Sequence, residues 1–290
     1  MSGRSIGVAV VQAELGNSDG SNVPKMEGLI REAAAAGASV VVLPELFEGP
    51  YFPKTKDEAH RELARQASGH PMLSAMAVLA RECSVVLPLS FFEQHASGRF
   101  NTVATVDADG SCLGFYRKSH IPEGAGYEED YYFAPGDKPP AAWATRFGRV
   151  GVSICWDQWY PECARLMALD GAELIIYPSA IGSEPGRPDL YTKDPWQRVM
   201  AGHAVANSVP VAAANRIGCE DGQTFYGHSF ICDHRGRIVA ELGADEEGVA
   251  LAEIDLDEAA DYRQWFGLLC GRRPELYSDL SRTNETSGKV

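Results

Sequence analysis

The sequence predicts an α/β fold made of two related halves that stack into a four-layer αββα sandwich. The chain contains an internal repeat, in which two pairs of segments resemble each other: 6–10 with 150–154, and 37–44 with 171–178. The second strand of each half is an uninterrupted apolar run, which is typical of strands buried on both faces. Amphipathic helices would cover one face of each sheet, so the other face must meet a second sheet.

The order of elements repeats along the chain as βαβαββ in each half. The first helix of each half is followed by a glycine, Gly37 or Gly171, where a helix commonly ends. Each half closes with a hairpin whose turn carries the Asp and Gly residues that favour tight turns. The predicted segments are helices 23–36 and 71–82, strand 84–89 and hairpin 101–117 in the first half, and helices 161–169 and 194–207, strand 209–214 and hairpin 228–242 in the second.

We expect residues 1–290 to form a single domain, because no linker rich in Pro, Gly or Ser separates the halves. A helix-like segment begins near Asp257, after the second half. The tail from about 279 to 290 is polar, which is typical of a flexible terminus.

Charge and hydropathy exclude several classes of function. The chain has 40 acidic and 26 basic residues, for a formal net charge of −14. Such a field repels phosphate backbones, so we expect no nucleic acid partner. No apolar run approaches the roughly 20 residues that span a bilayer. The apolar stretch at 6–11 lacks a signal-peptide cleavage site, so we expect a cytoplasmic protein that does not bind membranes.

Cys155 stands out among the seven cysteines. It follows the strand at 150–154 and precedes Pro161, which suits the first turn of a helix. Turn amides and the helix dipole at such a position lower the pKa of a thiol and favour a nucleophile. The alternative is a small buried apolar residue, as most cysteines are.

Two charged residues also follow strands. Glu45 ends an apolar strand and is flanked by Leu46 and Phe47, so partial desolvation would raise its pKa toward that of a general base. Lys118 follows a hairpin strand and could stabilise an oxyanion. Either residue could instead be a solvated surface group. No histidine has a recognisable catalytic context.

Metal and cofactor motifs are missing from the sequence. It contains no HxH, HExxH or CxxC pattern for zinc, and no GxGxxG or GxxxxGK[ST] pattern for nucleotides. It also lacks the GxSxG pattern of serine hydrolases. We therefore expect no metal and no cofactor.

Taken together, three motifs resemble those of the nitrilase superfamily of carbon–nitrogen hydrolases, in the same order. They are Leu-Pro-Glu45-Leu-Phe, Arg-Lys118-Ser-His-Ile-Pro and Ser-Ile-Cys155-Trp-Asp-Gln-Trp-Tyr-Pro-Glu. The resemblance extends over about residues 5 to 278. It implies the αββα fold, a catalytic Glu45–Lys118–Cys155 triad and a homo-oligomer, a dimer or larger. It also implies that Glu129 assists the triad and that the backbone N–H of Trp156 contacts the oxyanion.

Within the superfamily, the sequence is most similar to the subfamily that hydrolyses N-carbamoylputrescine to putrescine, ammonia and carbon dioxide in polyamine synthesis. The similarity lies in segments 47–52, 117–122, 133–137, 154–159, 180–185, 214–218 and 224–227. The ammonium end of that small-molecule substrate requires an acid or an aromatic face. We expect Glu184 to supply the acid, and Tyr51 and Trp156 to contact the substrate.

Other functions remain open at this point. A carboxylate-tailed ureide such as N-carbamoyl-β-alanine or an N-carbamoyl amino acid would require a basic residue, and Arg187 keeps this alternative open. An aliphatic amide is a further alternative. Alternatives of another class are an inactive scaffold subunit and a thiol-redox protein that uses Cys155, with Cys163 eight residues away.

Overall fold

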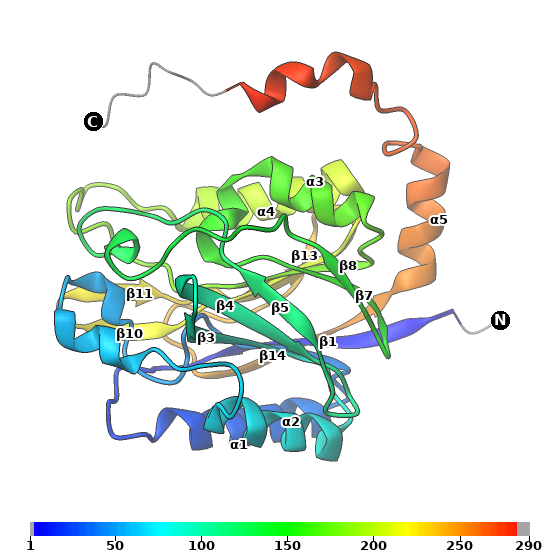
Figure 1. Ribbon diagram of the computed structural model, residues 1–290. Helices are drawn as coiled ribbons and strands as arrows, with labels where there is room; N and C mark the ends of the chain where they lie inside the picture. Colours follow the sequence, from blue (N-terminus) through cyan, green and yellow to red (C-terminus); the bar gives the residue numbers. More distant parts are fainter. Residues whose placement is uncertain (1–2, 283–290) are drawn as a thin grey trace.

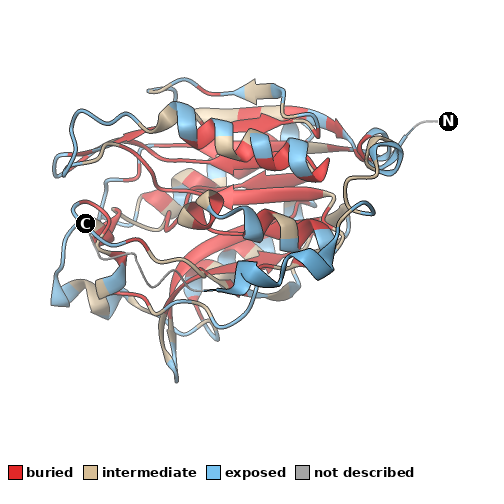
Figure 2. Ribbon diagram, turned by 90° about the horizontal axis from the view of Figure 1, so that it is seen from above, coloured by how far each residue is buried: buried red, intermediate tan, exposed pale blue. Residues whose placement is uncertain are grey.

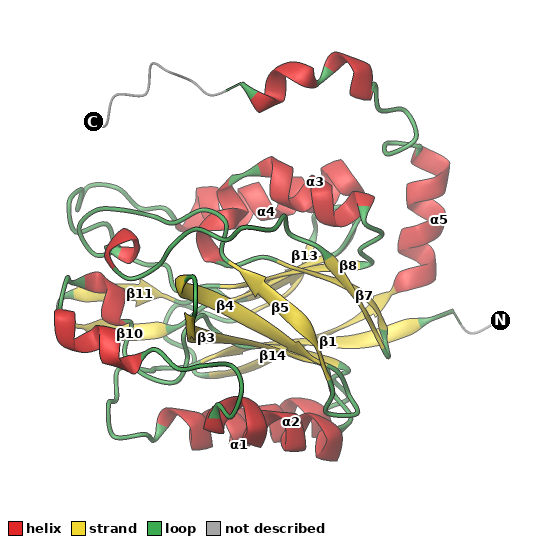
Figure 3. Ribbon diagram, viewed as in Figure 1, coloured by secondary structure: helices red, strands yellow, loops and turns green. Residues whose placement is uncertain are grey.

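Two β-sheet layers pack face to face in the computed structural model, which describes residues 3–282. Helices α1 (Asn22–Ala35) and α2 (Pro71–Cys83) cover the outer face of one layer. Helices α3 (Pro161–Leu169) and α4 (Lys193–Asn207) cover the outer face of the other (Figures 1 and 3). This arrangement confirms the predicted αββα sandwich.

The first sheet layer joins two three-stranded groups, β14-β1-β2 and β3-β4-β5. Backbone hydrogen bonds from Val41 N to Val86 O and from Val86 N to Ser39 O connect β2 to the segment that leads into β3. The strands are β1 (Ser5–Gln12), β2 (Val40–Val42), β3 (Leu87–His95), β4 (Gly98–Val106), β5 (Cys112–Arg117) and β14 (Gly248–Asp255).

The second sheet has the order β13-β12-β9-β8-β7-β6. Its strands are β6 (Ala142–Thr145), β7 (Gly148–Val152), β8 (Leu174–Pro178), β9 (Val211–Ala214), β12 (Phe230–Cys232) and β13 (Ile238–Glu241). Read from the opposite edge, this order matches the first layer strand for strand, with β7 equivalent to β1 and β8 equivalent to β2. The internal repeat in the sequence therefore corresponds to a repeat in the structure.

Alternating side chains of the inner strands separate the core into two regions. Val8 and Val10 of β1 belong to the core between the two sheets, together with Ile176 of β8. Ala9 and Val11 face the other way and pack with the residues of α1 and α2. This period of two is the strand pattern that buries both faces of a central sheet. The helices show the complementary pattern, with one side buried and the other exposed (Figure 2).

Several elements were not predicted from the sequence. β14 and β6 add an edge strand beside β1 and β7, respectively. A separate hairpin, β10 (Ile217–Glu220) and β11 (Gln223–Tyr226), interrupts the second half. The helix expected from near Asp257 is present as α5 (Leu256–Phe266), and the unpredicted 3₁₀ turns η5 (Pro274–Leu276) and η6 (Ser278–Ser281) follow it. Most of the predicted flexible tail lies outside the described residues.

Within residues 3–282, every helix is too short or too polar to cross a membrane.

Candidate active site

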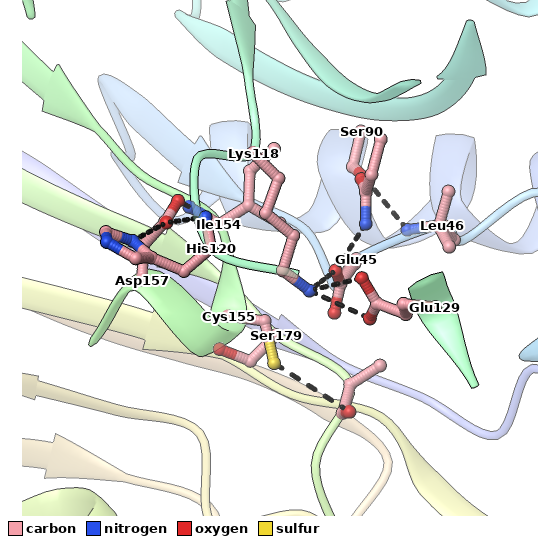
Figure 4. Close-up of polar contacts among 12 residues, drawn as sticks. Glu45, Leu46, Ser90, Lys118, His120, Glu129, Ile154, Cys155, Asp157 and Ser179 are labelled. Atoms are coloured by element: carbon pink, nitrogen blue, oxygen red, sulfur yellow. Dashed lines mark hydrogen bonds and ion pairs between the residues drawn. The ribbon is translucent and has the colours of Figure 1, made fainter. Parts of the chain in front are cut away.

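Glu45, Lys118 and Glu129 form one buried ionic cluster (Figure 4). The Lys118 Nζ atom lies 2.9 Å from Glu45 Oε1, and 2.8 and 2.7 Å from the two carboxylate oxygens of Glu129. Burial by itself would lower the pKa of Lys118, but the charges of Glu129 and Glu45 raise it above its ordinary value. The ammonium group therefore stays protonated throughout the physiological range.

Glu129 lies in the 3₁₀ turn η3 (Glu129–Tyr131) between the two halves. Burial raises the pKa of its carboxyl group, and the positive charge of Lys118 opposes this effect. The hydroxyl group of Tyr51 donates a hydrogen bond of 2.6 Å to Glu129 Oε1. Tyr51 is fully buried, and its hydroxyl group orients Glu129. Our expectation that Tyr51 also contacts the substrate stays a prediction.

The segment after β2 directs Glu45 into the cluster. Leu46 has a φ of 50°, a left-handed conformation that is unusual for a branched residue. The Ser90 Oγ atom accepts a hydrogen bond of 3.0 Å from Leu46 N. The Arg216 guanidinium group donates to the carbonyl groups of Glu45 and Leu46 at 2.9 and 3.1 Å. The strained turn is therefore held from both sides.

The two carboxylate oxygens of Glu45 have different surroundings. Asn101 Nδ2 donates a hydrogen bond of 2.6 Å to Oε1, the same atom that contacts Lys118. Oε2 is buried and has no hydrogen-bond partner within the described part of the chain. A buried acceptor without a partner is energetically costly, and this one is available to take a proton.

Cys155 lies at the beginning of the 3₁₀ turn η4 (Cys155–Trp159), directly after the second sheet. Its φ of 38° is left-handed, which is a strained conformation at a site of this kind. Its sulfur lies beside the ionic cluster (Figure 4), and the thiol donates a hydrogen bond of 3.8 Å to Ala180 O.

Our expectation of a lowered thiol pKa was wrong. Burial raises the pKa of Cys155 well above its ordinary value, the carboxylates of Glu45 and Glu129 raise it further, and Lys118 only partly opposes them. The helix dipole gives little help because the residues after Cys155 form a short 3₁₀ turn, and α3 begins only at Pro161. The resting thiol is therefore protonated and requires a base, for which Glu45 is in place.

The residues predicted to bind the substrate differ in burial and in their contacts. Glu184 is half-buried, and burial raises its pKa. Arg187 is exposed and forms an ion pair with Asp189 at 2.9 Å, so it does not neutralise Glu184. Trp156, next to the nucleophile, is partly exposed and makes an edge contact with the ring of Trp159.

Two buried tyrosines lie in the same part of the molecule as Glu184 and the nucleophile. Burial raises the pKa of Tyr127 and of Tyr226, and the electrostatic influence of Glu184 and Cys155 adds to both shifts. The hydroxyl groups of these tyrosines therefore lie within electrostatic range of both residues.

Among residues 3–282, one group has the proximity to hold a metal ion: His120, Asp157 and Cys163, whose ligand atoms lie within 4.8 Å of one another. Both carboxylate oxygens of Asp157 already accept hydrogen bonds from N–H and O–H groups. A cation would displace these donors, so we assign the group to hydrogen bonding.

The sequence-based reasoning missed Asn101, Arg216 and Asp157. Asn101 begins a predicted strand although asparagine is unfavourable in strands, which was the available signal. Arg216 lies two residues after the end of an apolar strand, and a buried arginine there requires partners. Asp157 had no distinguishing signal, because its partners lie 37 and 41 residues away in the sequence.

The sequence model of the family described as carbon-nitrogen hydrolase matches residues 7–264. The chain belongs to the carbon–nitrogen hydrolase family. The resemblance to the nitrilase superfamily is thereby confirmed, and the protein is a hydrolase that acts on carbon–nitrogen bonds of the amide type.

Two curated members of the family are similar over nearly the whole length. An N-carbamoylputrescine amidase of Solanum lycopersicum is 47% identical over 285 residues, covering 96% of this chain and 95% of the relative. A citrullinase of Francisella tularensis is 45% identical over 282 residues, covering 96% of this chain and 99% of the relative.

Solved structures of family members share the fold. The carbon–nitrogen hydrolase from Helicobacter pylori G27 has a TM-score of 0.89 and 34% identity, covering 96% of this chain and 99% of that one. Saccharomyces cerevisiae Nit3, a member of branch 10 of the nitrilase superfamily, has a TM-score of 0.80 and 28% identity, covering 93% and 97%, respectively.

Proposed function

We propose that this carbon–nitrogen hydrolase cleaves the ureido group of N-carbamoylputrescine through a covalent intermediate on Cys155. The observation that carries the choice of substrate is Glu184, a half-buried carboxylate that forms an ion pair with no described residue. A carboxylate in such a place is suited to a cationic ligand group, because the ion pair would offset its desolvation. Putrescine ends in an ammonium group of that kind.

In the first step, Glu45 Oε2 takes the thiol proton as the sulfur attacks the ureido carbonyl carbon. A carbon–sulfur bond forms, and the carbonyl electron pair moves to the oxygen. The ammonium group of Lys118 stabilises the resulting oxyanion, together with the backbone N–H of Trp156. Glu129 and Tyr51 hold Lys118 protonated and oriented during this step.

In the second step, the oxyanion collapses and the terminal carbon–nitrogen bond breaks. Glu45 returns its proton to the departing nitrogen, which leaves as ammonia, and a carbamoyl group remains on the sulfur. Glu45 then deprotonates a water molecule that attacks the same carbon. The thiol is released together with an N-alkyl carbamate, which decomposes to the amine and carbon dioxide.

Citrulline is the second candidate, because it carries the same ureido group and a relative of 45% identity is a citrullinase. Its tail bears a carboxylate as well as an ammonium group, so it requires a basic partner. Arg187 already forms an ion pair with Asp189, which favours the diamine-type tail.

Ammonia release from N-carbamoylputrescine, citrulline, N-carbamoyl-β-alanine and a simple aliphatic amide tests the proposal. We expect the highest kcat/KM for N-carbamoylputrescine. Glu184→Gln should raise its KM about 10- to 100-fold, as for the loss of a charge-assisted hydrogen bond, and leave the amide unaffected. Arg187→Gln is the matched control and should behave as wild type. Equal KM values for wild type and Glu184→Gln would show that Glu184 does not bind the ammonium group of the substrate.

We also propose a homo-oligomer. The C-terminal segment runs past α3 and α4 (Figure 1) and exposes five large hydrophobic side chains: Trp265, Phe266, Leu276, Tyr277 and Leu280. A second copy of the chain would cover such a surface. Sedimentation equilibrium distinguishes this from a monomer.

A further inference from the structure

The two segments that carry Lys118 and Cys155 are joined by a pair of side chains. His120 lies two residues after Lys118, and Asp157 lies two residues after Cys155. The His120 Nδ1 atom is 2.8 Å from Asp157 Oδ1, and the backbone N–H of His120 donates to the same oxygen at 3.0 Å (Figure 4). The hydrogen-bonded pair of His120 and Asp157 therefore lies close to both catalytic residues.

The second oxygen of Asp157 makes the same connection from the other side. Oδ2 accepts a hydrogen bond of 3.1 Å from the backbone N–H of Ile154 and one of 2.7 Å from the hydroxyl group of Tyr116. Ile154 immediately precedes Cys155, and Tyr116 lies two residues before Lys118. One carboxylate thus holds residues on both sides of Lys118 and the residue before the nucleophile.

This carboxylate connects the two sheets. Tyr116 belongs to β5 of the first layer, whereas Ile154 follows β7 of the second layer. Asp157 is fully buried, so its hydrogen bonds with Tyr116 and Ile154 are shielded from water, and all four of its hydrogen bonds are of the stronger, charge-assisted kind. The position of the ammonium group relative to the thiol therefore depends on this residue.

Asp157 also fixes the strained turn of the nucleophile. Its backbone N–H donates to Ile154 O at 3.0 Å, while its side chain accepts from Ile154 N. This reciprocal pair closes a loop around Cys155, whose left-handed φ is strained. Transition-state stabilisation by a fixed charge falls steeply when that charge is displaced by about 1 Å.

We propose that Asp157 is a positioning residue that sets the placement of the Lys118 ammonium group relative to the Cys155 sulfur. It does not touch the substrate and exchanges no proton in the reaction. The inference rests on the Cys155–Lys118 chemistry of the proposed function, but not on which ureide is the substrate.

Asp157→Asn tests the proposal, because an amide retains the shape but cannot accept all four hydrogen bonds. The substrate-free readout is the pH dependence of Cys155 alkylation by iodoacetamide, followed by mass spectrometry of the Cys155 peptide because exposed cysteines also react. We expect the alkylation curve to move to higher pH, since Lys118 would lower the thiol pKa less effectively. With substrate, kcat should fall about 100-fold while KM changes less than about threefold.

Asp233→Asn is the matched control, because it makes the same chemical change at another carboxylate with several donors. Asp233 accepts hydrogen bonds from the backbone N–H groups of Arg235 and Arg237 in the turn between β12 and β13, outside the segments that carry Lys118 and Cys155. We expect this variant to lose thermal stability and to keep the wild-type alkylation curve.

Tyr116→Phe removes a single hydroxyl donor and serves if Asp157→Asn fails to fold. It should shift the alkylation curve in the same direction by a smaller amount. The proposal is overturned if the folded variants show lower melting temperatures but wild-type alkylation curves, which is the pattern of a purely structural residue. Alkylation shifts without turnover of any ureide would instead contradict the proposed substrate and leave the positioning role standing.

Discussion

The two halves of the molecule differ most where their first strands end. In β1, Val11 remains paired with Val249 because β14 runs along the entire strand. β7 has a shorter neighbour: its pairing with β6 ends at Gly151, and the strand ends at Val152. The repeat aligns Val11 with Cys155. At this position the first half is still a paired strand, whereas the second half has already left its sheet and carries the nucleophile.

A second difference concerns the strands β2 and β8. The repeat aligns Glu45 with Ser179, and the Glu45 N–H donates to Ser179 O at 3.2 Å, so the two positions meet. Glu45 enters an ionic cluster, whereas the Ser179 hydroxyl donates to Gln158 Oε1 at 3.2 Å. The duplicated scaffold thus brings equivalent strand ends together. The first half then supplies the charges and the second half the nucleophile.

The largest effect is expected from removing the positive charge of Lys118, which the first half supplies. We expect Lys118→Met to lower kcat by about 10²–10³, as for the loss of an oxyanion donor. Stability should also fall by about 3–5 kcal/mol, because two buried carboxylates lose their counter-ion. Ammonia release and thermal melting measure the two effects.

Lys138→Met is the control for this substitution, because Lys138 is an exposed lysine. It should match wild type in both assays. A folded Lys118→Met enzyme with more than half of the wild-type kcat would contradict the role of the first half as the source of charge.

Tyr51→Phe sharpens the comparison, because it removes one hydroxyl group from behind Glu129. We expect kcat to fall about 10-fold, equivalent to about 1.4 kcal/mol, since the hydrogen bond reaches a charged group. Tyr132→Phe is matched: Tyr132 is also buried, and its hydroxyl group donates to Thr55 O at 2.6 Å. An equal loss of kcat in both variants would show that removing any buried tyrosine hydroxyl group disturbs the site, and would contradict a specific role for Tyr51.

The last expected effect concerns the pH dependence of stability. The pKa of the Cys155 thiol is raised by burial, so the folded protein binds this proton more tightly than the unfolded chain does. The stabilisation is complete below the unfolded pKa of about 8.5 and is lost as the pH rises above it, by up to about 1.4 kcal/mol per pH unit.

Cys155→Ala removes this contribution and no other cysteine. Between pH 7 and 10, we expect its melting temperature to fall less than that of wild type. Parallel curves for the two proteins would show that the thiol is not buried in its protonated form.

Much of this architecture is predictable from the sequence, because the signals are local. Apolar runs, the Gly residues after α1 and α3, and the hairpin turns all report on their own segments. β14 was not predicted, because its partner β1 lies more than 200 residues earlier and pairing at that range leaves no local pattern in the sequence.

The active site is predictable only in part. Glu45, Lys118 and Cys155 stand at strand ends in recognisable motifs. The pKa of Cys155 was mispredicted, because the burial and the two carboxylates that raise it come from distant segments. Asp157 gains its role from four hydrogen bonds, three of them made with residues of another segment. Such roles depend on the tertiary structure.

The most direct test of the central claim is to trap the covalent intermediate. Wild-type enzyme is quenched in acid during turnover of N-carbamoylputrescine, and its peptides are analysed by mass spectrometry. The account predicts an adduct on the Cys155 peptide with the mass of the substrate minus ammonia, and no adduct in Cys155→Ala. Steady turnover with an unmodified Cys155 peptide, together with activity of Cys155→Ala, would contradict it.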